Sequence, residues 1–303
     1  MLRSQGRVPV MLFRGILLIA SMLPAASHAQ GALQEVMDSD RYFAERSRDR
    51  GQQSAFEAFL APGSVLFRPT AVDGMQWVSS HEPAAGRLDW MPLAGAASCA
   101  GGLAVTTGHW NYFNESDGAA AEGYYLTVWR ADSEPRWRVL LDHGINTPVD
   151  GDADAALVKV LQSFRARSAS RGCKNSAARA GLARAEQSLN EQIASRGLAV
   201  SLRDWLWQGA IAFRDGRGAV PYGDLGNADG FEESERLDAR SQGLLGEAAG
   251  DLGVTYGELR AKSAPSERPA RLWVYIRVWI REDRRWQIAM EMLVPVSADD
   301  IVD

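Results

Sequence analysis

Two acidic residues near the ends of two similar segments could serve as proton acceptors. Asp142 lies near the end of YYLTVWRADSEPRWRVLLDHG (residues 124–144), and Glu291 takes the corresponding place in YIRVWIREDRRWQIAME (residues 275–291). A carboxylate removed from water can take a proton from carbon near neutral pH, and we interpret Asp142 as the candidate catalytic residue. An acid at a strand end can equally be a paired or exposed charge. His143 would point away from Asp142 in a strand, so we expect no dyad and a solvated or capping role for it.

Arginine and aromatic residues supply candidate ligand contacts in the first half of the chain. Arg68 and Arg214 each follow a phenylalanine of a predicted strand, where they could bind an anionic group or pair with Asp142 and Glu291. Aromatic walls with one histidine suit a flat apolar ligand, although tryptophans also fill cores. The candidate ligand-binding residues are Arg68, Trp77, His81, His109, Trp110 and Tyr112.

Other site chemistries lack their residue patterns. The four histidines and two cysteines show no metal-binding spacing. The run DGDAD (residues 150–154) resembles a calcium loop, but Ala155 and Leu161 stand where an EF-hand needs Gly and Glu. No phosphate-binding glycine loop or GxSxG motif is present. We therefore expect no metal and no cofactor.

The amino terminus has the layout of a secretory leader. Arg3, Arg7 and Arg14 precede the apolar run GILLIASML, which is shorter than the roughly 20 residues of a membrane span. We expect a signal peptide over residues 1–29, no stable membrane insertion after cleavage, and a periplasmic or secreted protein. Removing the three arginines changes the formal charge from −5 to −8, and an acidic chain without a basic face predicts no nucleic-acid partner.

Two cysteines, Cys99 and Cys173, lie in different segments of the chain. In an oxidising compartment they can form a disulfide that joins a linker to the first domain. Two free thiols are the alternative, and the sequence leaves the two possibilities equal.

The chain contains a tandem duplication. RGQQSAFEAFLAPGSVLFR (residues 50–68) aligns without a gap with RGLAVSLRDWLWQGAIAFR (residues 196–214), and LAVTTG (residues 103–108) with LGVTYG (residues 252–257). Three similar blocks in one order at shifts of 146 to about 150 residues indicate a repeat. We predict domains at residues 33–147 and 182–296, joined by a linker (148–181) in which DADAALVKVLQSF could form a helix capped by Asp152.

Each copy predicts helices first and long strands after, which indicates an α+β fold with an antiparallel sheet. The blocks FRP, GLAVTTGHW, GYYLTVW and RWRVLLDHG resemble the nuclear transport factor 2-like superfamily, in particular its SnoaL-like and ketosteroid isomerase-like branches. The second copy resembles it more weakly, with FRD and MEML in place of FRP and LDHG. The resemblance implies two cone-shaped domains, in which N-terminal helices and a curved sheet enclose a pocket, and a sheet face used for dimerisation.

Strand alternation predicts two distinct faces in the second copy. Leu272, Val274, Ile276, Val278 and Ile280 share one face, and aromatic and cationic residues share the other. We expect the aliphatic face to be the core of its domain. The opposite faces of the two domains would then pack together as an internal pseudo-dimer, through Tyr125, Trp129, Tyr275 and Trp279.

We interpret the chain as an exported pocket protein that binds a small apolar or amphipathic ligand in its first domain, the second being structural. Two alternatives stay open. One is an isomerase, cyclase or lyase in which Asp142 is the base and Arg68, Trp110 or Tyr112 stabilises the oxyanion. The other is a protein–protein assembly module that uses its sheet faces.

Overall fold

The computed structural model describes residues 25–114, 116–118, 120–132, 137–171, 173, 177–225, 236–261 and 271–297. The first unit consists of α1 (Ala25–Arg50), α2 (Gln52–Phe59), β1 (Leu60–Phe67), β2 (Ala71–Asp73), α3 (Gly74–Ser80), β3 (Arg87–Ala97), β4 (Leu103–Phe113), β5 (Ala120–Ala131) and β6 (Trp137–Asn146). After α4 (Gly151–Arg171), the second unit consists of α5 (Ala178–Arg196), α6 (Leu198–Arg203), β7 (Leu206–Arg214), β8 (Gly218–Pro221), the 3₁₀ helix η1 (Tyr222–Asp224), β9 (Leu237–Gly246), β10 (Leu252–Ala261), β11 (Leu272–Glu282) and β12 (Arg285–Val296).

Each unit contains a six-stranded sheet, and the two sheets have the same topology. The strand orders are β2-β1-β6-β5-β4-β3 and β8-β7-β12-β11-β10-β9. The α+β fold predicted from the sequence is therefore present twice. The prediction of an antiparallel sheet needs one correction, because β1 pairs with β6, and β7 with β12, in parallel.

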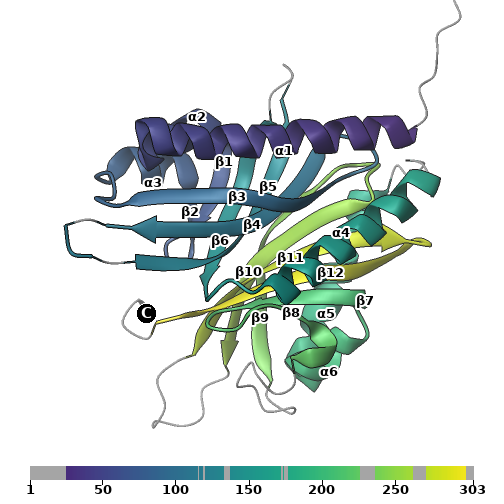
Figure 1. Cartoon of the computed structure of the whole chain (residues 1–303). Helices are drawn as coiled ribbons and strands as arrows, with labels where there is room; N and C mark the ends of the chain where they lie inside the picture. Colours follow the sequence, from purple (N-terminus) through teal and green to yellow (C-terminus); the bar gives the residue numbers. More distant parts are fainter. Residues whose placement is uncertain are drawn as a thin grey trace, which may run out of the picture.

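Helices cover the outer face of each sheet. Figure 1 shows α1, α2 and α3 over the first sheet and α5 and α6 over the second. The first helices of the two units, α1 and α5, are followed by equivalent glycines, Gly51 and Gly197, which have φ angles of 86° and 90°. Only glycine adopts this backbone region readily, so the repeated Arg-Gly pair fixes the same helix–helix corner in both units.

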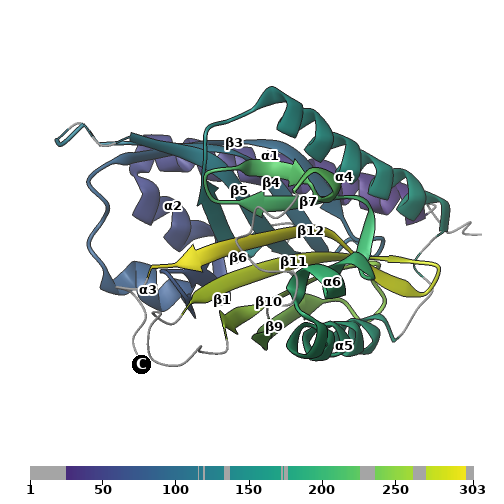
Figure 2. The same ribbon diagram turned by 90° about the horizontal axis from the view of Figure 1, so that it is seen from below.

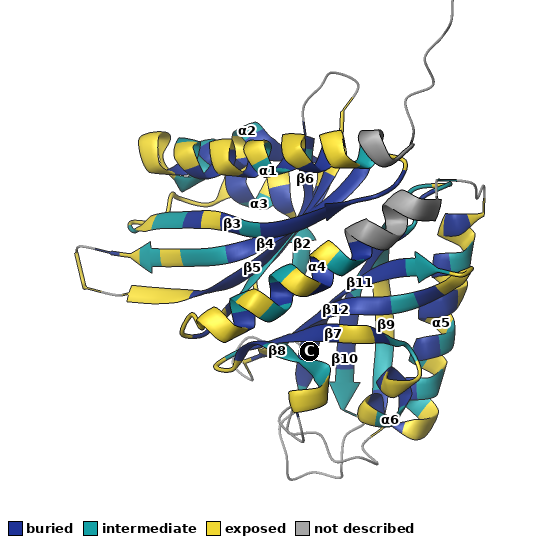
Figure 3. Cartoon of the chain, turned by 45° about the vertical axis from the view of Figure 1, so that its right-hand side comes forward, coloured by how far each residue is buried: buried dark blue, intermediate teal, exposed yellow. Residues whose placement is uncertain are grey.

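The inner faces of the two sheets bury each other. Aliphatic residues of β5 and β11 meet there in one core, and the inner strands are buried along most of their length (Figure 3). The members of this shared core on those two strands are Tyr124, Leu126, Val128, Leu272, Val274, Ile276, Val278 and Ile280.

Two units therefore pack as an internal pseudo-dimer, but the residues predicted for the interface were wrong. Tyr125 and Trp129 lie in the first unit's own core, and Tyr275 and Trp279 in that of the second. The alternation of residues along the strands was predicted correctly. The aliphatic face lies between the two units, however, and the aromatic face lies in the core of each unit, which is the reverse of the prediction. Branched aliphatic side chains form a flat face suited to sheet-on-sheet packing, whereas buried Trp N–H and Tyr O–H groups need polar partners, which the helices supply inside each cone.

The segment predicted as a linker contains a helix that belongs to the shared core. The buried face of α4 contributes Ala153, Leu157, Val160, Leu161 and Phe164. Figure 2 shows α4 beside β3 and β7, where it closes one side of the junction. The Asp150 side chain accepts a hydrogen bond from the Asp152 N–H at 3.0 Å, so Asp150 caps this helix in place of the predicted Asp152.

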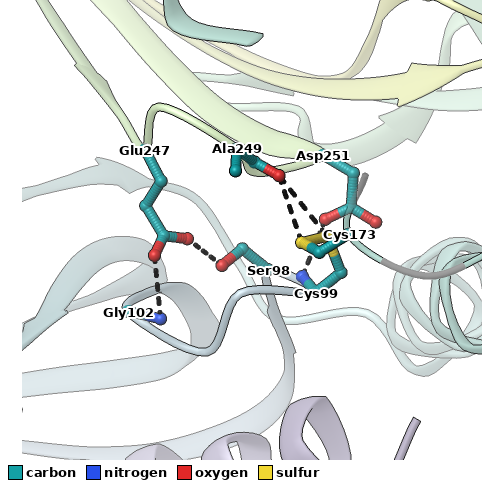
Figure 4. Close-up of a disulfide and its surroundings, with 7 residues drawn as sticks. All are labelled: Ser98, Cys99, Gly102, Cys173, Glu247, Ala249 and Asp251. Atoms are coloured by element: carbon teal, nitrogen blue, oxygen red, sulfur yellow. Dashed lines mark hydrogen bonds between the residues drawn. A yellow bond between two sulfur atoms is a disulfide. The ribbon is translucent and has the colours of Figure 1, made fainter. Parts of the chain in front are cut away.

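A disulfide joins Cys99 and Cys173 where equivalent turns of the two units meet (Figure 4). The Glu247 carboxylate accepts hydrogen bonds from the Ser98 hydroxyl and, at 3.1 Å, from the Gly102 N–H. Asp251 accepts the Cys99 N–H at 2.8 Å. These hydrogen bonds hold the turn between β3 and β4 against the turn between β9 and β10, and the disulfide ties Cys173, which follows α4, to the first of these turns.

The predicted leader lies mostly outside the described residues, and only its positions 25–29 fall within α1. No helix in the described part of the chain combines the length and the apolar composition that a membrane crossing requires.

Candidate functional site

A cavity of about 470 Å³ lies in the first unit, inside the cone formed by its sheet and helices. Aromatic side chains from helices and strands make most of its wall. These are Phe43, Phe56, Phe67, Trp77, Trp90, Trp110, Tyr112 and Tyr125. Its polar lining residues are Gln52, Arg68, Thr127, Asp142, His143 and Asn146. Size and lining are those of a small-molecule site.

Asp142 faces this cavity from β6, as predicted for the candidate acid. Thr127, its partner across the β5–β6 pair, donates a hydrogen bond to Asp142 Oδ1 at 2.5 Å. Burial raises the pKa of Asp142, and the Thr127 hydrogen bond and the Arg68 charge offset this only in part. Among the described residues, none forms an ion pair with Asp142 within 4.0 Å. The carboxylate can therefore interact with a molecule in the cavity.

A second acid, Asp40 of α1, lies behind the cavity wall and is fully buried. It accepts hydrogen bonds from Tyr125 Oη at 2.8 Å and from Trp90 Nε1 at 2.9 Å. Burial raises the pKa of Asp40 to about 6 against these hydrogen bonds, and the nearby charge of Asp142 adds to the rise. Tyr125 connects this acid to the cavity, because its ring forms part of the wall.

Four of the six predicted ligand-binding residues line the cavity. Arg68, which is exposed at the rim, places its guanidinium 4.9 Å from the centre of the Trp77 ring, and Tyr112 lies on the wall. Trp110 also lies on the wall, where its Nε1 donates to the backbone oxygens of Tyr124 and Ile145. Those bonds occupy the only donor of Trp110, which removes it as an oxyanion donor.

The other two predicted ligand contacts, His81 and His109, do not line the cavity. His81 is exposed and stacks on Trp77 with ring centres 4.3 Å apart. His109 points to the opposite face of β4 from Trp110, where its Nε2 lies 2.7 Å from Asp154 Oδ1 of α4. The alternation along β4 explains this, since residues 109 and 110 cannot share a face.

His143 is also placed differently from its predicted solvated or capping role. Its ring stacks on Phe67 with centres 4.6 Å apart, and its Nε2 is buried without a hydrogen-bond partner. Burial, assisted by the Arg68 charge, lowers the pKa of His143 to about 3. The ring therefore acts as a neutral packing group near neutral pH.

In the second unit, the equivalent place is filled by a buried ion network. Arg277 donates to Glu291 Oε1 and Glu186 Oε1, both at 3.1 Å, and Arg214 donates to Glu291 Oε2 at 2.8 Å. Burial by itself would raise the pKa of Glu291, but the two guanidinium groups hold it below its ordinary value. Arg68 and Arg214 thus differ, because only Arg214 forms the predicted pair with its acid.

Asp40, its counterpart Glu186, and Thr127 are functional candidates that the sequence reasoning missed. The shift of 146 residues that aligns Arg50 with Arg196 also aligns Asp40 with Glu186. Extending the first repeat block by ten residues toward the amino terminus would have found this pair of acids.

The described residues contain no group of three or more His, Cys, Asp or Glu side chains arranged to hold a metal ion.

No protein-family model matches this chain, and no curated protein sequence does. Similar solved structures include a nuclear transport factor 2-like superfamily protein from Salmonella enterica (16% identity, TM-score 0.32), for which the match covers 40% of this chain and 94% of that one. A nuclear transport factor 2-like protein from Cytophaga hutchinsonii matches at 15% identity and a TM-score of 0.31, over 39% and 98%. A protein of unknown function from Shewanella oneidensis, of the same fold class, matches at 12% and 0.32, over 38% and 97%. Both units described above have the helix-and-sheet architecture that the resemblance to this superfamily implies.

Proposed function

We propose that the first unit binds a small apolar or amphipathic molecule in its cavity. The observation that carries the proposal is an aromatic-walled cavity of about 470 Å³ with the carboxylate of Asp142, which forms no ion pair with any described residue, on its wall. The aromatic groups would bury the apolar body of the ligand, and the polar groups would fix its orientation.

We further propose that the protein works outside the cytoplasm, in the periplasm or after secretion. The leader pattern of residues 1–29 supports this location, and so does the disulfide between Cys99 and Cys173, since such bonds persist in oxidising compartments.

Native mass spectrometry of the protein purified gently from the cells that make it would test ligand binding. We expect a mass above that of the denatured chain, and no added mass in Thr127→Arg, which would place a long side chain in the cavity. An equal added mass in both proteins would place the molecule elsewhere. A bare mass for the wild type, together with no uptake of apolar dyes or probe compounds, would contradict the proposal.

A second candidate function is proton transfer at carbon, with Asp142 as the base. The raised pKa of Asp142 and its position on the cavity wall favour this function over a structural ion pair. Arg68 at the rim and the hydroxyl groups of Tyr112 and Tyr125 on the wall could stabilise an oxyanion, although Tyr125 Oη already donates to Asp40. Incorporation of deuterium from heavy water into the recovered ligand, lost in Asp142→Asn, would support this function, and unchanged exchange in that variant would refute it.

The buried sheet faces do not favour the third possibility, a protein–protein assembly module. The aliphatic sheet faces that could hold another protein bury each other between the two units.

A further inference from the structure

The two cones share a nearly identical set of buried polar residues. In each, an acid on the first helix accepts a hydrogen bond from a strand tyrosine, as in Asp40 with Tyr125 (2.8 Å) and Glu186 with Tyr275 (2.7 Å). In each, a tryptophan Nε1 donates to a threonine, at 2.7 Å in the first unit and 2.8 Å in the second. Both units also carry the acid on the last strand and the arginine that follows the phenylalanine of β1 or β7.

One position of this set differs in a way that changes the charge of the cone. Thr127 faces Asp142 across β5 and β6, and Arg277 faces Glu291 across β11 and β12 in the same register. Arg277 places a cation between the two acids of its cone, with its guanidinium 4.0 Å from the centre of the Tyr275 ring. Thr127 is too short to do so.

The guanidinium of Arg277 therefore occupies the space between the two acids of the second cone, as a bound cation would. Its guanidinium is bound by two carboxylates and an aromatic face, and its side chain is fully buried. The first cone keeps the corresponding carboxylates, Asp40 and Asp142, and the corresponding ring of Tyr125, and has a cavity beside them. Burial raises the pKa values of both acids, and for Asp142 the Arg68 charge offsets this only in part.

From this comparison we infer that the ligand of the first cone is an organic cation, an ammonium or guanidinium group on an apolar body, whose charged group takes the place that Arg277 occupies in the second cone. The inference rests on the proposed function, since it names the chemical class of the molecule in the same cavity. Asp142 would bind the charged group directly, and the Tyr125 ring would stabilise it through its π face. The remaining aromatic wall would hold the apolar body.

The arginine at the rim does not oppose this assignment. Arg214, its counterpart, and Arg277 both bind Glu291 in the second cone, so one carboxylate there accommodates two cations. Arg68 also lies over Trp77 and is exposed to solvent, which weakens its repulsion of a cation deeper in the cavity.

Calorimetric titration of the full-length protein with three probes of equal shape would test the inference. The probes are 4-phenylbutylammonium, 4-phenyl-1-butanol and 4-phenylbutanoate. We expect the ammonium to bind about tenfold more tightly than the alcohol, and the carboxylate most weakly, because only the ammonium forms an ion pair with the Asp142 carboxylate. Asp142→Asn should remove this tenfold preference of the ammonium over the alcohol. Asp89→Asn, at an acid paired with Arg48 outside the cavity, is the matched control and should change neither affinity.

Thr127→Arg provides the second arm, because it supplies the cation from the chain itself. We expect it to abolish binding of both ammonium and alcohol while circular dichroism shows a folded protein, whereas Thr127→Val, which adds no cation, should still bind the ammonium more tightly than the alcohol. Equal binding of ammonium and alcohol, or tightest binding of the carboxylate, would overturn the cation assignment and leave the pocket proposal standing. Failure of all three probes and of apolar dyes to bind the wild type would overturn both proposals.

Discussion

The first and second cones descend from one duplicated pattern, and they handle the same pair of buried acids in different ways. In the second, Arg214 and Arg277 neutralise Glu291, and Arg277 also pairs with Glu186. In the first, Asp40 and Asp142 have only neutral hydrogen-bond donors close to them, and their pKa values rise. The difference lies at one cross-strand position, where Arg277 places a cation between the two acids of the second cone and Thr127 places none between those of the first.

The two units also differ in the size of the side chains around this cross-strand position. Gly144 lies under the Trp110 ring, where an added Cβ would come 3.0 Å from the indole Nε1. The corresponding positions of the second unit hold Leu293 and Leu259, both buried. The glycine–tryptophan pair of the first unit thus corresponds to two buried leucines in the second.

The largest effect is expected from Arg277→Met, which removes the cation of the second cone and keeps most of its apolar volume. Glu186 and Glu291 would then be buried with less compensation, and we expect a loss of about 3–5 kcal/mol in the free energy of unfolding. Denaturation by urea would measure it.

The control is Arg240→Met, at an arginine whose surface ion pair with Asp238 is exposed. That change should cost less than about 1 kcal/mol. Equal losses in the two variants would mean that the ion network of the second cone contributes nothing specific.

The next effect concerns the pH dependence contributed by Asp40. Its pKa is about 6 in the folded protein and 3.8 in the unfolded chain, so the folded state holds the proton more tightly. The stability contributed by Asp40 is complete below pH 3.8 and is lost as the pH rises through 6. Relative to Asp40→Asn, the wild type should therefore lose roughly 2 kcal/mol between pH 4 and pH 7, since part of the contribution is already lost at pH 4. Urea unfolding at both pH values would measure this, and a constant difference would contradict it.

The matched measurement in the second cone is Glu291→Gln, for which the sign is opposite. The pKa of Glu291 is lowered in the folded protein. Its contribution to the free energy of unfolding is therefore present above pH 4.5 and is lost as the pH falls below that value. Both variants keep His143, whose own titration cancels when each is compared with the wild type. The same sign in the two units would show that their acids are not held differently.

The smallest effects should be equal in the two cones, because they test what the cones share. Thr106 and Thr255 each accept the N–H of a buried tryptophan, and valine at either position leaves that donor without a partner. We expect Thr106→Val and Thr255→Val each to lose about 1–3 kcal/mol in thermal or urea unfolding. A loss confined to one variant would indicate that the polar set is functional in only one unit.

Much of the fold could be predicted because it depends on local patterns that the duplication displays twice. The aligned blocks predicted the strands that correspond to β1, β4, β5 and β6 and their counterparts β7, β10, β11 and β12, and alternation correctly grouped the residues of each strand face. Alternation could not say which face turned outward, because Trp129 and Trp279 are apolar enough for either place. Their N–H groups decided it, since the required acceptors, Thr106 and Thr255, lie inside the cones.

The candidate site divides in the same way. Asp142, Arg68, Trp77, Trp110 and Tyr112 could be found as residues of suitable type near strand ends, and the structure places all five on one cavity. Asp40 could not be connected with them, since about one hundred residues separate it from Asp142 and only the packing of α1 on the sheet brings them together.

The sequence by itself determined the repeat, the α+β class, the two faces of each strand and the acid at the end of each last strand, because all of these follow from residue types and short spacings. Only the tertiary structure decided which faces the two units bury against each other and which buried acids have a cation between them. Those outcomes depend on what lies across a sheet pair or beneath a helix, as with Thr127 beside Asp142 and Arg277 between Glu186 and Glu291, and such neighbours are set by packing between segments far apart in the chain.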